Sequence, residues 1–153
     1  EKSENLEIAL ERIQKEAEIE VRKGVKQLIL SDKNISEKRL PIPMLLSVGA
    51  INSYLINNKL RGYVSINVQT GEALDTHSFA TLLGVGATTV NPYLALDCLY
   101  QRFEKKLFGN FEYEDCIKRY IKSVKNWVFM CESCLLEVKQ DNKFYIYGGT
   151  WKG

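Results

Sequence analysis

Apolar residues recur at three- and four-residue spacing near the start of the chain, between residues 3 and 23. Glu and Lys fill the other positions, as they do on the solvent face of an amphipathic helix. Gly24 follows, and glycine commonly ends a helix in the left-handed conformation. The pattern predicts a helix over residues 3–23, whose apolar face carries Leu6, Leu10, Ile13, Ala17 and Val21.

Three short apolar runs have the character of strands: KQLILSD at 26–32, YVSINVQ at 63–69 and ATTVN at 87–91. Helical spacing lies between them, over 43–58 and from about 72 to 83, and Pro92 can open another helix. The expected apolar positions of these helices are Leu45, Leu46, Val48, Ile51 and Leu55; Leu74, Phe79, Leu82 and Leu83; and Leu94, Leu96, Leu99 and Phe103. Strand–helix alternation with short connections predicts parallel βα units, an α/β fold of partial (β/α) barrel character.

The last part of the chain follows a weaker pattern. YEDCIKRYIKSV at 113–124 is amphipathic and predicts a helix, and FYIYGG at 144–149 fits a strand. We expect residues 1–126 to form the α/β segment, and residues 127–153 to be a divergent tail that packs loosely or is separable from the core.

Composition narrows the class of protein. A chain of 153 residues with 45% hydrophobic content suits one domain with a real core. The net charge of +2 gives no general argument for nucleic acid or an anionic membrane as partner. No apolar stretch approaches the ~20 residues that a membrane span needs, and the charged start EKSENLEIALER is unlike a secretory signal peptide. The four cysteines suggest reduced thiols, so we expect a cytoplasmic protein, with a plastid as the alternative.

The stretch LGVGATTVNPY at 83–93 invites comparison with a phosphate-binding glycine loop. Such a loop follows a strand and opens a helix, so that backbone N–H groups point at the anion. Here the expected helix comes before the glycines and the strand after them, and a helix C-terminus repels phosphate. We therefore expect Gly24 and one of Gly84 and Gly86 to be left-handed caps with positive φ.

Two other candidate chemistries are weak. His77 is the one histidine, and no nucleophile motif accompanies it, so a surface or core histidine is the simpler interpretation. Cys131 and Cys134 have the CxxC spacing of zinc and redox sites, but a structural zinc needs a second pair. Two incidental thiols explain them more simply. We expect no catalytic, cofactor-binding or metal-binding residue in this chain.

The polar segments that follow the strands hold more interest, because parallel α/β folds gather ligands and partners at the carboxyl ends of their strands. The loop over residues 32–43 is long for a βα connection, and long loops are often functional. We expect residues 32–43 and 69–77 to form a domain-contact surface rather than a small-molecule pocket. The candidate interface residues are Asp32, Lys33, Gln69, Thr70, Gly71, Glu72, His77, Asn91 and Tyr93.

Two long segments carry a family resemblance. LILSDKNISEKRLPIPMLLSVGAINSYLI and VSINVQTGEALDTHSFATLLGVGATTVNPYLAL, with a weaker RYIKSV, resemble the central domain of glutamate synthase over roughly residues 9–125. The order of strand, loop and helix is the same as in that family, and loop sequences such as PIPMLL and NPYLA are shared.

The resemblance implies a fragment of a glutamate synthase-like protein, which makes glutamate from glutamine and 2-oxoglutarate in ammonia assimilation. In that family the central domain bridges a glutaminase domain and an FMN-binding synthase domain, and supports the ammonia route between them. The resemblance places FMN and an iron–sulfur cluster elsewhere in a full-length parent, so no catalytic residue carries over.

The chain also departs from the family. A histidine-rich stretch usual after SVGA is replaced by Ile51-Asn52-Ser53-Tyr54, an acidic residue before TGEA is Gln69, and Thr76 stands where a histidine usually precedes His77. The family pattern is lost after Asn126. Two other functions stay open: a free-standing half-barrel ligand binder or small enzyme that uses its strand-end loops, and an interaction module for a separate glutaminase or synthase chain.

Overall fold

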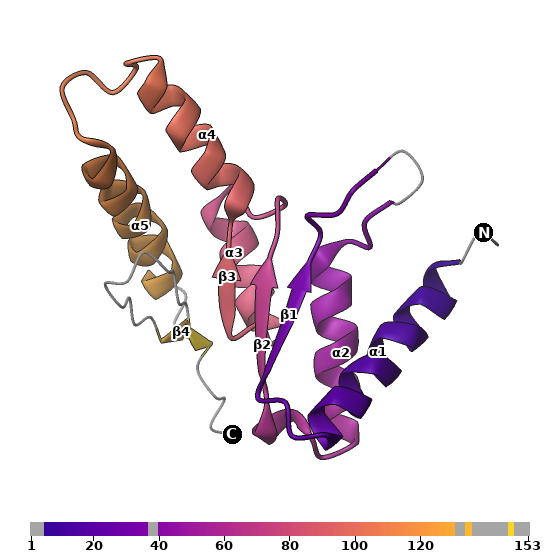
Figure 1. Ribbon diagram of the computed structural model, residues 1–153. Coiled ribbons are helices and arrows are strands. Elements are labelled where there is room, and N and C mark those ends of the chain that lie inside the picture. Colours follow the sequence, from indigo (N-terminus) through magenta and orange to yellow (C-terminus); the bar gives the residue numbers. More distant parts are fainter. Residues whose placement is uncertain (1–4, 37–39, 131–133, 136–146, 149–153) are drawn as a thin grey trace.

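Three parallel strands form the centre of the molecule. The computed structural model describes residues 5–36, 40–130, 134–135 and 147–148. Within them, β1 (Gln27–Ser31), β2 (Ser65–Gln69) and β3 (Thr89–Asn91) form one sheet in the order β1-β2-β3 (Figure 1). The predicted parallel α/β fold is confirmed, and in these residues the sheet stays open rather than closing into a barrel.

Helices alternate with the strands as the pattern predicts. Figure 1 shows α1 at the end of the molecule nearest β1, and α4 and α5 side by side at the opposite end. A short antiparallel pair, β4 and β5, follows α5. The remaining elements are α1 (Leu6–Arg22), α2 (Met44–Asn57), the 3-10 helix η1 (Arg61–Tyr63), α3 (Thr76–Gly84), α4 (Tyr93–Glu104), α5 (Tyr113–Met130), β4 (Cys134–Leu135) and β5 (Tyr147–Gly148).

Side-chain caps and glycines set the helix ends. The side chain of Asn5 accepts a hydrogen bond from the backbone N–H of Ile8 at 2.9 Å, which starts α1. Gly24 and Gly86 have φ of +97° and +115°, so the predicted left-handed caps after α1 and α3 are confirmed. Gly84 is the last residue of α3 and lies outside the left-handed region.

The core lies between one face of the sheet and the helices. Ile66, Val68 and Val90 on the strands are at most 1% exposed. They belong to one apolar cluster with residues of α1, α2, α3 and α5. The opposite face is open at β1, where Ile29 is 69% exposed. Consecutive right-handed crossovers place the connecting helices on one face of a sheet, which accounts for this asymmetry.

Several expected core positions are wrong. Leu74 precedes α3 and is 56% exposed, because Asp75 starts the helix by accepting a hydrogen bond from the backbone N–H of Ser78. Leu45 and Leu46 lie in the first turn of α2, beside the buried line of that helix, and are also exposed. Leu94 is 41% exposed, because α4 slopes away from the sheet and packs on α5 instead (Figure 1).

The expected boundary at residue 126 falls inside α5. Val128 is fully buried in the core, so the expectation of loose packing is wrong at that residue. Tyr147–Gly148, within the expected strand at 144–149, does form a strand. Residues 131–133, 136–146 and 149–153 of the expected tail lie outside the described residues. None of the helices in the described ranges is long and apolar enough to cross a membrane.

Candidate functional site

The carboxyl ends of the three strands lie along one edge of the sheet, as the parallel order predicts. Ser31, Gln69 and Asn91 occupy the same level in the register. The backbone N–H of Asp32 donates to the carbonyl of Gln69 at 3.3 Å, and the N–H of Thr70 donates to the carbonyl of Asn91 at 3.0 Å. Residues that follow the strands are therefore held against one another.

Asp32 is the centre of this edge. Its carboxylate accepts a hydrogen bond from the Thr70 hydroxyl at 2.5 Å and from the Gly71 N–H at 3.1 Å. Asp32 is 8% exposed and Thr70 is fully buried. Burial raises the pKa of the Tyr93 hydroxyl, and the hydrogen bond and negative charge of Asp32 raise it further. One carboxylate thus ties together the segments that follow β1, β2 and β3.

Glu72 caps a helix that has no cap of its own. α2 begins after Pro43, whose side chain cannot accept a hydrogen bond. The carboxylate of Glu72 fills that place by accepting a hydrogen bond from the backbone N–H of Met44 at 2.9 Å. A negative charge at a helix N-terminus is favourable. The Glu72 backbone is held in turn, because its N–H donates to the Thr70 hydroxyl at 3.0 Å.

Tyr93 closes the edge from the start of α4. The ammonium of Lys33 lies 5.4 Å from the centre of the Tyr93 ring, in range of a cation–π contact. A Cβ added at Gly71 would lie 3.1 Å from the Tyr93 hydroxyl oxygen. Glycine at this position therefore permits the close approach of backbone and ring that brings the hydroxyl to Asp32.

The other expected residues take smaller parts. The side-chain carbonyl of Gln69 accepts a hydrogen bond from the Ser31 hydroxyl at 2.9 Å. Asn91 is exposed, and its backbone carbonyl accepts the hydrogen bond from the N–H of Thr70. His77 is exposed on the first turn of α3, outside this hydrogen-bonded set. The structure therefore brings together the expected residues of the strand ends and leaves the histidine apart.

At the opposite end of the sheet lies a cluster around Arg61 that sequence reasoning missed. The guanidinium donates to the Asn52 side chain at 2.7 Å, to the carbonyl of Val64 at 2.5 Å and to the carbonyl of Gly86 at 2.8 Å. Burial lowers the pKa of Arg61. The acceptors come from three different segments, so Arg61 joins α2, the entry to β2 and the turn after α3. The sequence contains no motif that signals such a cluster.

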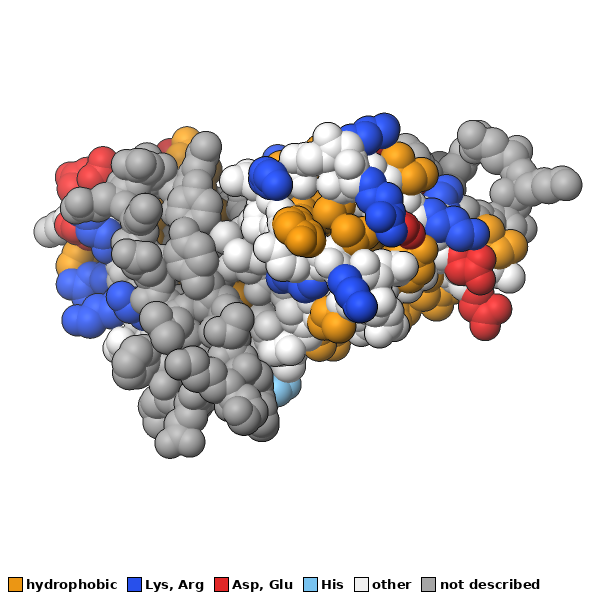
Figure 2. Space-filling model, turned by 90° about the horizontal axis from the view of Figure 1, so that it is seen from below, with side chains coloured by type: hydrophobic (Ala, Val, Ile, Leu, Met, Phe, Trp, Pro, Cys, Tyr) orange, Lys and Arg blue, Asp and Glu red, His pale blue; other side chains and the backbone are white. Residues whose placement is uncertain are grey.

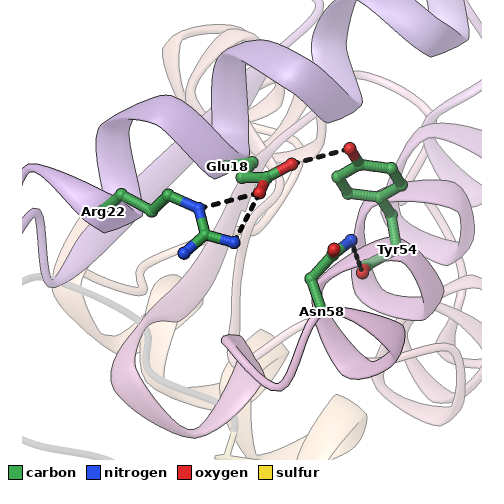
Figure 3. Close-up of polar contacts among 4 residues, drawn as sticks. All are labelled: Glu18, Arg22, Tyr54 and Asn58. Carbon is green, nitrogen blue, oxygen red and sulfur yellow. Dashed lines mark hydrogen bonds and ion pairs between the residues drawn. The ribbon is translucent and has the colours of Figure 1, made fainter.

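The first two helices are joined by a third polar set (Figure 3). The Tyr54 hydroxyl on α2 donates to the Glu18 carboxylate on α1 at 2.7 Å, and Arg22 pairs with the same carboxylate at 2.7 Å. The Asn58 side-chain amide donates to the carbonyl of Tyr54 at 2.9 Å. The hydrogen bonds from Tyr54 and Arg22 lower the pKa of Glu18.

An open groove of about 510 Å³ lies between α4 and α5. Its lining is mostly apolar and includes Leu99, Leu107, Phe111 and Tyr120. Burial raises the pKa of Tyr120 to about 12, so this phenol stays protonated near neutral pH. The described residues contain no group of three or more His, Cys, Asp or Glu that could hold a metal ion.

The two ends of the sheet differ in the charged and apolar side chains that they carry. Figure 2 shows the end seen from below in Figure 1, where apolar side chains are flanked by Lys and Arg. η1 and the end of α2 lie at this end, and they expose Tyr63 and Ile56 to 64% and 54%. The strand-end edge instead holds the carboxylates of Asp32 and Glu72, both engaged in hydrogen bonds within the chain.

Comparison with known proteins gives a family for this arrangement. The family described as glutamate synthase central domain matches residues 1–132, and a domain of unknown function matches residues 116–153. The NADPH glutamate synthase large chain of Azospirillum brasilense is 45% identical over 121 residues, 79% of this chain and 8% of that protein. The corresponding large chain of Bacillus subtilis is 42% identical over 126 residues, 82% of this chain and 8% of that protein.

A plant relative shows the same relation. The chloroplastic ferredoxin-dependent glutamate synthase of Spinacia oleracea is 39% identical over 132 residues, again 79% of this chain and 8% of that protein. This chain therefore corresponds to a small part of each of these relatives. The match confirms the resemblance seen in the segments at 28–56 and 64–96. The chain belongs to the glutamate synthase central-domain family.

Proposed function

We propose that this chain is a non-catalytic bridging segment of a glutamate synthase. In such an enzyme it lies between a glutaminase domain and an FMN-binding synthase domain, and it supports the route by which ammonia reaches 2-oxoglutarate. Family membership supports the parent activity. The observation that carries the bridging role is the strand-end edge, whose carboxylates are engaged within the chain while its loops expose apolar side chains.

The carboxylates are poorly placed for chemistry. A general acid or base must reach a proton on its substrate. Asp32 is buried and accepts hydrogen bonds from Thr70 and Gly71, and Glu72 is bound to the N-terminus of α2. Their contacts hold the fold together, which argues against a small enzyme or ligand binder that uses the strand-end loops.

The loops around these carboxylates have the character of a contact surface. Leu40 is 90% exposed and Ile35 is 55% exposed in the loop at 32–43, and Leu74 is 56% exposed in the segment at 69–77. Exposed apolar side chains on two neighbouring loops fit a surface that another protein part covers. We propose that a flanking domain of the parent covers them.

The same proposal assigns cofactors and location. FMN and an iron–sulfur cluster belong to other domains of a full-length parent, and this segment holds neither. We place the protein in the cytoplasm, or in a plastid, as the name of the chloroplastic spinach relative suggests. We also propose that a separate tail follows the central-domain segment and begins after α5, rather than at the expected residue 126, because Val128 belongs to the core.

Hydrogen exchange tests the bridging role. Amide exchange in residues 32–43 and 69–77 is measured in this chain alone and in a longer parent chain that carries both flanking domains. We expect exchange in both loops to slow in the longer chain, while α1, which contributes no residue to the strand-end edge, changes little. Equal exchange in the two proteins would contradict the proposal. Slowing on addition of a separately expressed glutaminase or synthase chain would favour the interaction-module alternative.

A chimera tests the link to activity. The matched segment of the Azospirillum brasilense large chain is replaced by residues 1–132, and glutamine hydrolysis is compared with glutamate formation. We expect Leu40→Asp to lower the yield of glutamate per glutamine hydrolysed. The matched control is Ile19→Asp, a similarly large exposed side chain on α1, at 52% exposure. Equal effects of the two substitutions would count against a specific contact at Leu40.

A further inference from the structure

The end of the sheet where the strands begin carries exposed apolar side chains among cations (Figure 2). We call it the strand-start end and define it by Lys23, Lys26, Ile56, Lys59, Arg61 and Tyr63. A segment that bridges two domains needs two contact surfaces. The strand-end edge supplies one, and the strand-start end lies at the other end of the same parallel strands. Its side chains therefore indicate what the second neighbour carries.

Tyr63 is the main apolar group of this end. It closes the 3-10 helix η1, and its backbone N–H donates to the carbonyl of Leu60 at 3.1 Å. Tyr63 is 64% exposed, and Ile56 on α2 is 54% exposed. The neighbouring Val64 is buried in the core, so the fold fixes the backbone beside the ring and leaves the ring itself outside. A tyrosine held in this way offers a large contact area at a small entropic cost, as interface anchors do.

Two lysines flank this tyrosine. Lys59 precedes it by four positions, and Lys26 lies beside the same segment, since its carbonyl accepts a hydrogen bond from the N–H of Ser65 at 2.9 Å. Both lysines are exposed, and neither pairs with a carboxylate in the described part of the chain. Cations near helix C-termini are favourable, which accounts for Lys59 after α2. It does not account for Lys26, which directly precedes β1.

The carboxylates nearest to this end are already engaged. Glu18 pairs with Arg22 at 2.7 Å, and Glu20 pairs with Lys23 at 2.7 Å. Arg61 adds a further positive charge, because its acceptors among the described residues are uncharged: an amide side chain, two backbone carbonyls and a hydroxyl. The strand-start end therefore keeps a positive charge that the described residues do not neutralise.

We propose that the strand-start end is the second contact surface of the bridging segment, and that its partner is an acidic surface of the parent enzyme outside this chain. The partner places carboxylates against Lys26 and Lys59, and an apolar hollow around Tyr63. This inference rests on the proposed bridging function. The relatives leave ample room for such a partner, because the chain corresponds to 8% of the length of the bacterial large chains. Opposite charges across an interface favour the correct partner and orientation.

The mixed character of the patch favours a protein surface over a polyanion. An aromatic and an aliphatic side chain stand among separate lysines, and protein interfaces combine an apolar centre with a polar rim in this way. Nucleic acid binding relies on many cations that follow the phosphates, and the net charge of +2 supplies no such excess. Nucleic acid and an anionic membrane are therefore the alternatives that the test must distinguish.

Zero-length crosslinking tests the pairing directly. Residues 1–132 replace the matched segment of the Azospirillum brasilense large chain, and a carbodiimide joins lysine amines to carboxylates that touch them. We expect mass spectrometry to show Lys26 or Lys59 coupled to an Asp or Glu outside residues 1–132. The pair of Lys23 and Glu20, whose charged atoms lie 2.7 Å apart, provides the internal reference. Coupling of that pair without any from Lys26 or Lys59 overturns the proposal, and the longer parent chain replaces a chimera that does not fold.

Charge reversal tests whether the pairing matters. Lys26→Glu combined with Lys59→Glu should abolish these crosslinks and lower the yield of glutamate per glutamine hydrolysed by the chimera. The matched control is Lys105→Glu with Lys122→Glu, which changes the net charge equally at two exposed positions, one after α4 and one on α5. Equal yields of the two double variants overturn the proposal. Circular dichroism of this chain with the same substitutions checks that it is folded.

The result is separable from that at the strand-end edge. A lower yield with Leu40→Asp but not with the double variant at Lys26 and Lys59 overturns this inference and leaves the bridging proposal standing. Crosslinks from either lysine without a specific effect of Leu40→Asp support this inference and contradict the contact at Leu40. Binding of the chain to phosphatidylserine vesicles or to duplex DNA, lost in the double variant and without crosslinks in the chimera, would assign the patch to a membrane or to nucleic acid and overturn the proposal.

Discussion

Removing the Asp32 carboxylate tests the claim that one side chain holds three strand ends. Asp32→Ala deletes the acceptor for the Thr70 hydroxyl and the Gly71 N–H, and removes the partner of Tyr93. Thr70 is fully buried, so its hydroxyl is left without that acceptor in a place shielded from solvent. A hydrogen bond to a charged group contributes about 1.5–3 kcal/mol, and an unsatisfied buried group costs about 1–3 kcal/mol.

These terms overlap, and Gly71 and Tyr93 are only partly buried. We therefore expect Asp32→Ala to lower the free energy of unfolding by about 2–4 kcal/mol in total. Since stability is about 5–15 kcal/mol for a typical domain, this is a large fraction. Asp32→Asn keeps one acceptor oxygen and should lose about half as much.

Urea unfolding followed by intrinsic fluorescence and by circular dichroism measures the change, with the slope of the transition as a check on two-state behaviour. Exposed Asp97 on α4 provides a matched control, because Asp97→Ala should change stability by less than about 0.5 kcal/mol. A loss at Asp32 no larger than that at Asp97 would refute the reasoning, because it would mean that the strand ends hold together without the carboxylate.

Three further predictions follow from the geometry. Gly24→Ala should destabilise the fold by about 1 kcal/mol, since the site is open and only the positive φ resists a side chain. Gly86→Ala should destabilise it more, because the added Cβ would also clash with the Asn52 side chain, and thermal melts compare the two variants. The pKa of Glu18 is lowered from its ordinary value of 4.5, so its contribution to the free energy of unfolding is present above that value and is lost as pH falls through the lower folded pKa. Tyr54→Phe should therefore reduce the dependence of the unfolding free energy on pH in the acid range, and an unchanged dependence would contradict the contact. Truncation after residue 126 removes the buried Val128 and should destabilise by at least about 1.5 kcal/mol, whereas truncation after residue 132 should leave the melting temperature nearly unchanged; equal melting temperatures would show that Val128 adds nothing to the core.

The order of elements was predictable because each has a local signal. The spacing of apolar residues distinguishes the helix α1 from the strand β1. Gly24 and Gly86 each follow a helix and precede a strand, and this order, visible in the sequence, argues against a phosphate-binding loop. The shared edge of the strand ends followed from parallel alternation. Fold class is thus within reach of sequence, since local period and short connections leave few arrangements.

The contacts at that edge were not predictable, because they join residues far apart in the chain. Asp32 and Thr70 are separated by 38 positions, and nothing near either residue indicates which oxygen the hydroxyl will reach. The cluster around Arg61 was missed for the same reason. Leu74 was misplaced because its spacing continues the apolar period of α3, while the cap at Asp75 starts the helix after it.

The cap that Glu72 provides for α2 has a consequence for the order of folding. Glu72 reaches the N–H of Met44 across 28 positions, so the first turn of α2 is completed only after β2 has docked beside β1. A helix with its own cap can form early and locally. This helix depends on a non-local contact, which forms only after the entropic cost of closing the intervening loop has been overcome. Removing Glu72 should therefore accelerate unfolding much more than it slows folding. The beginning of α2 is, on this reasoning, among the last parts of the molecule to become native.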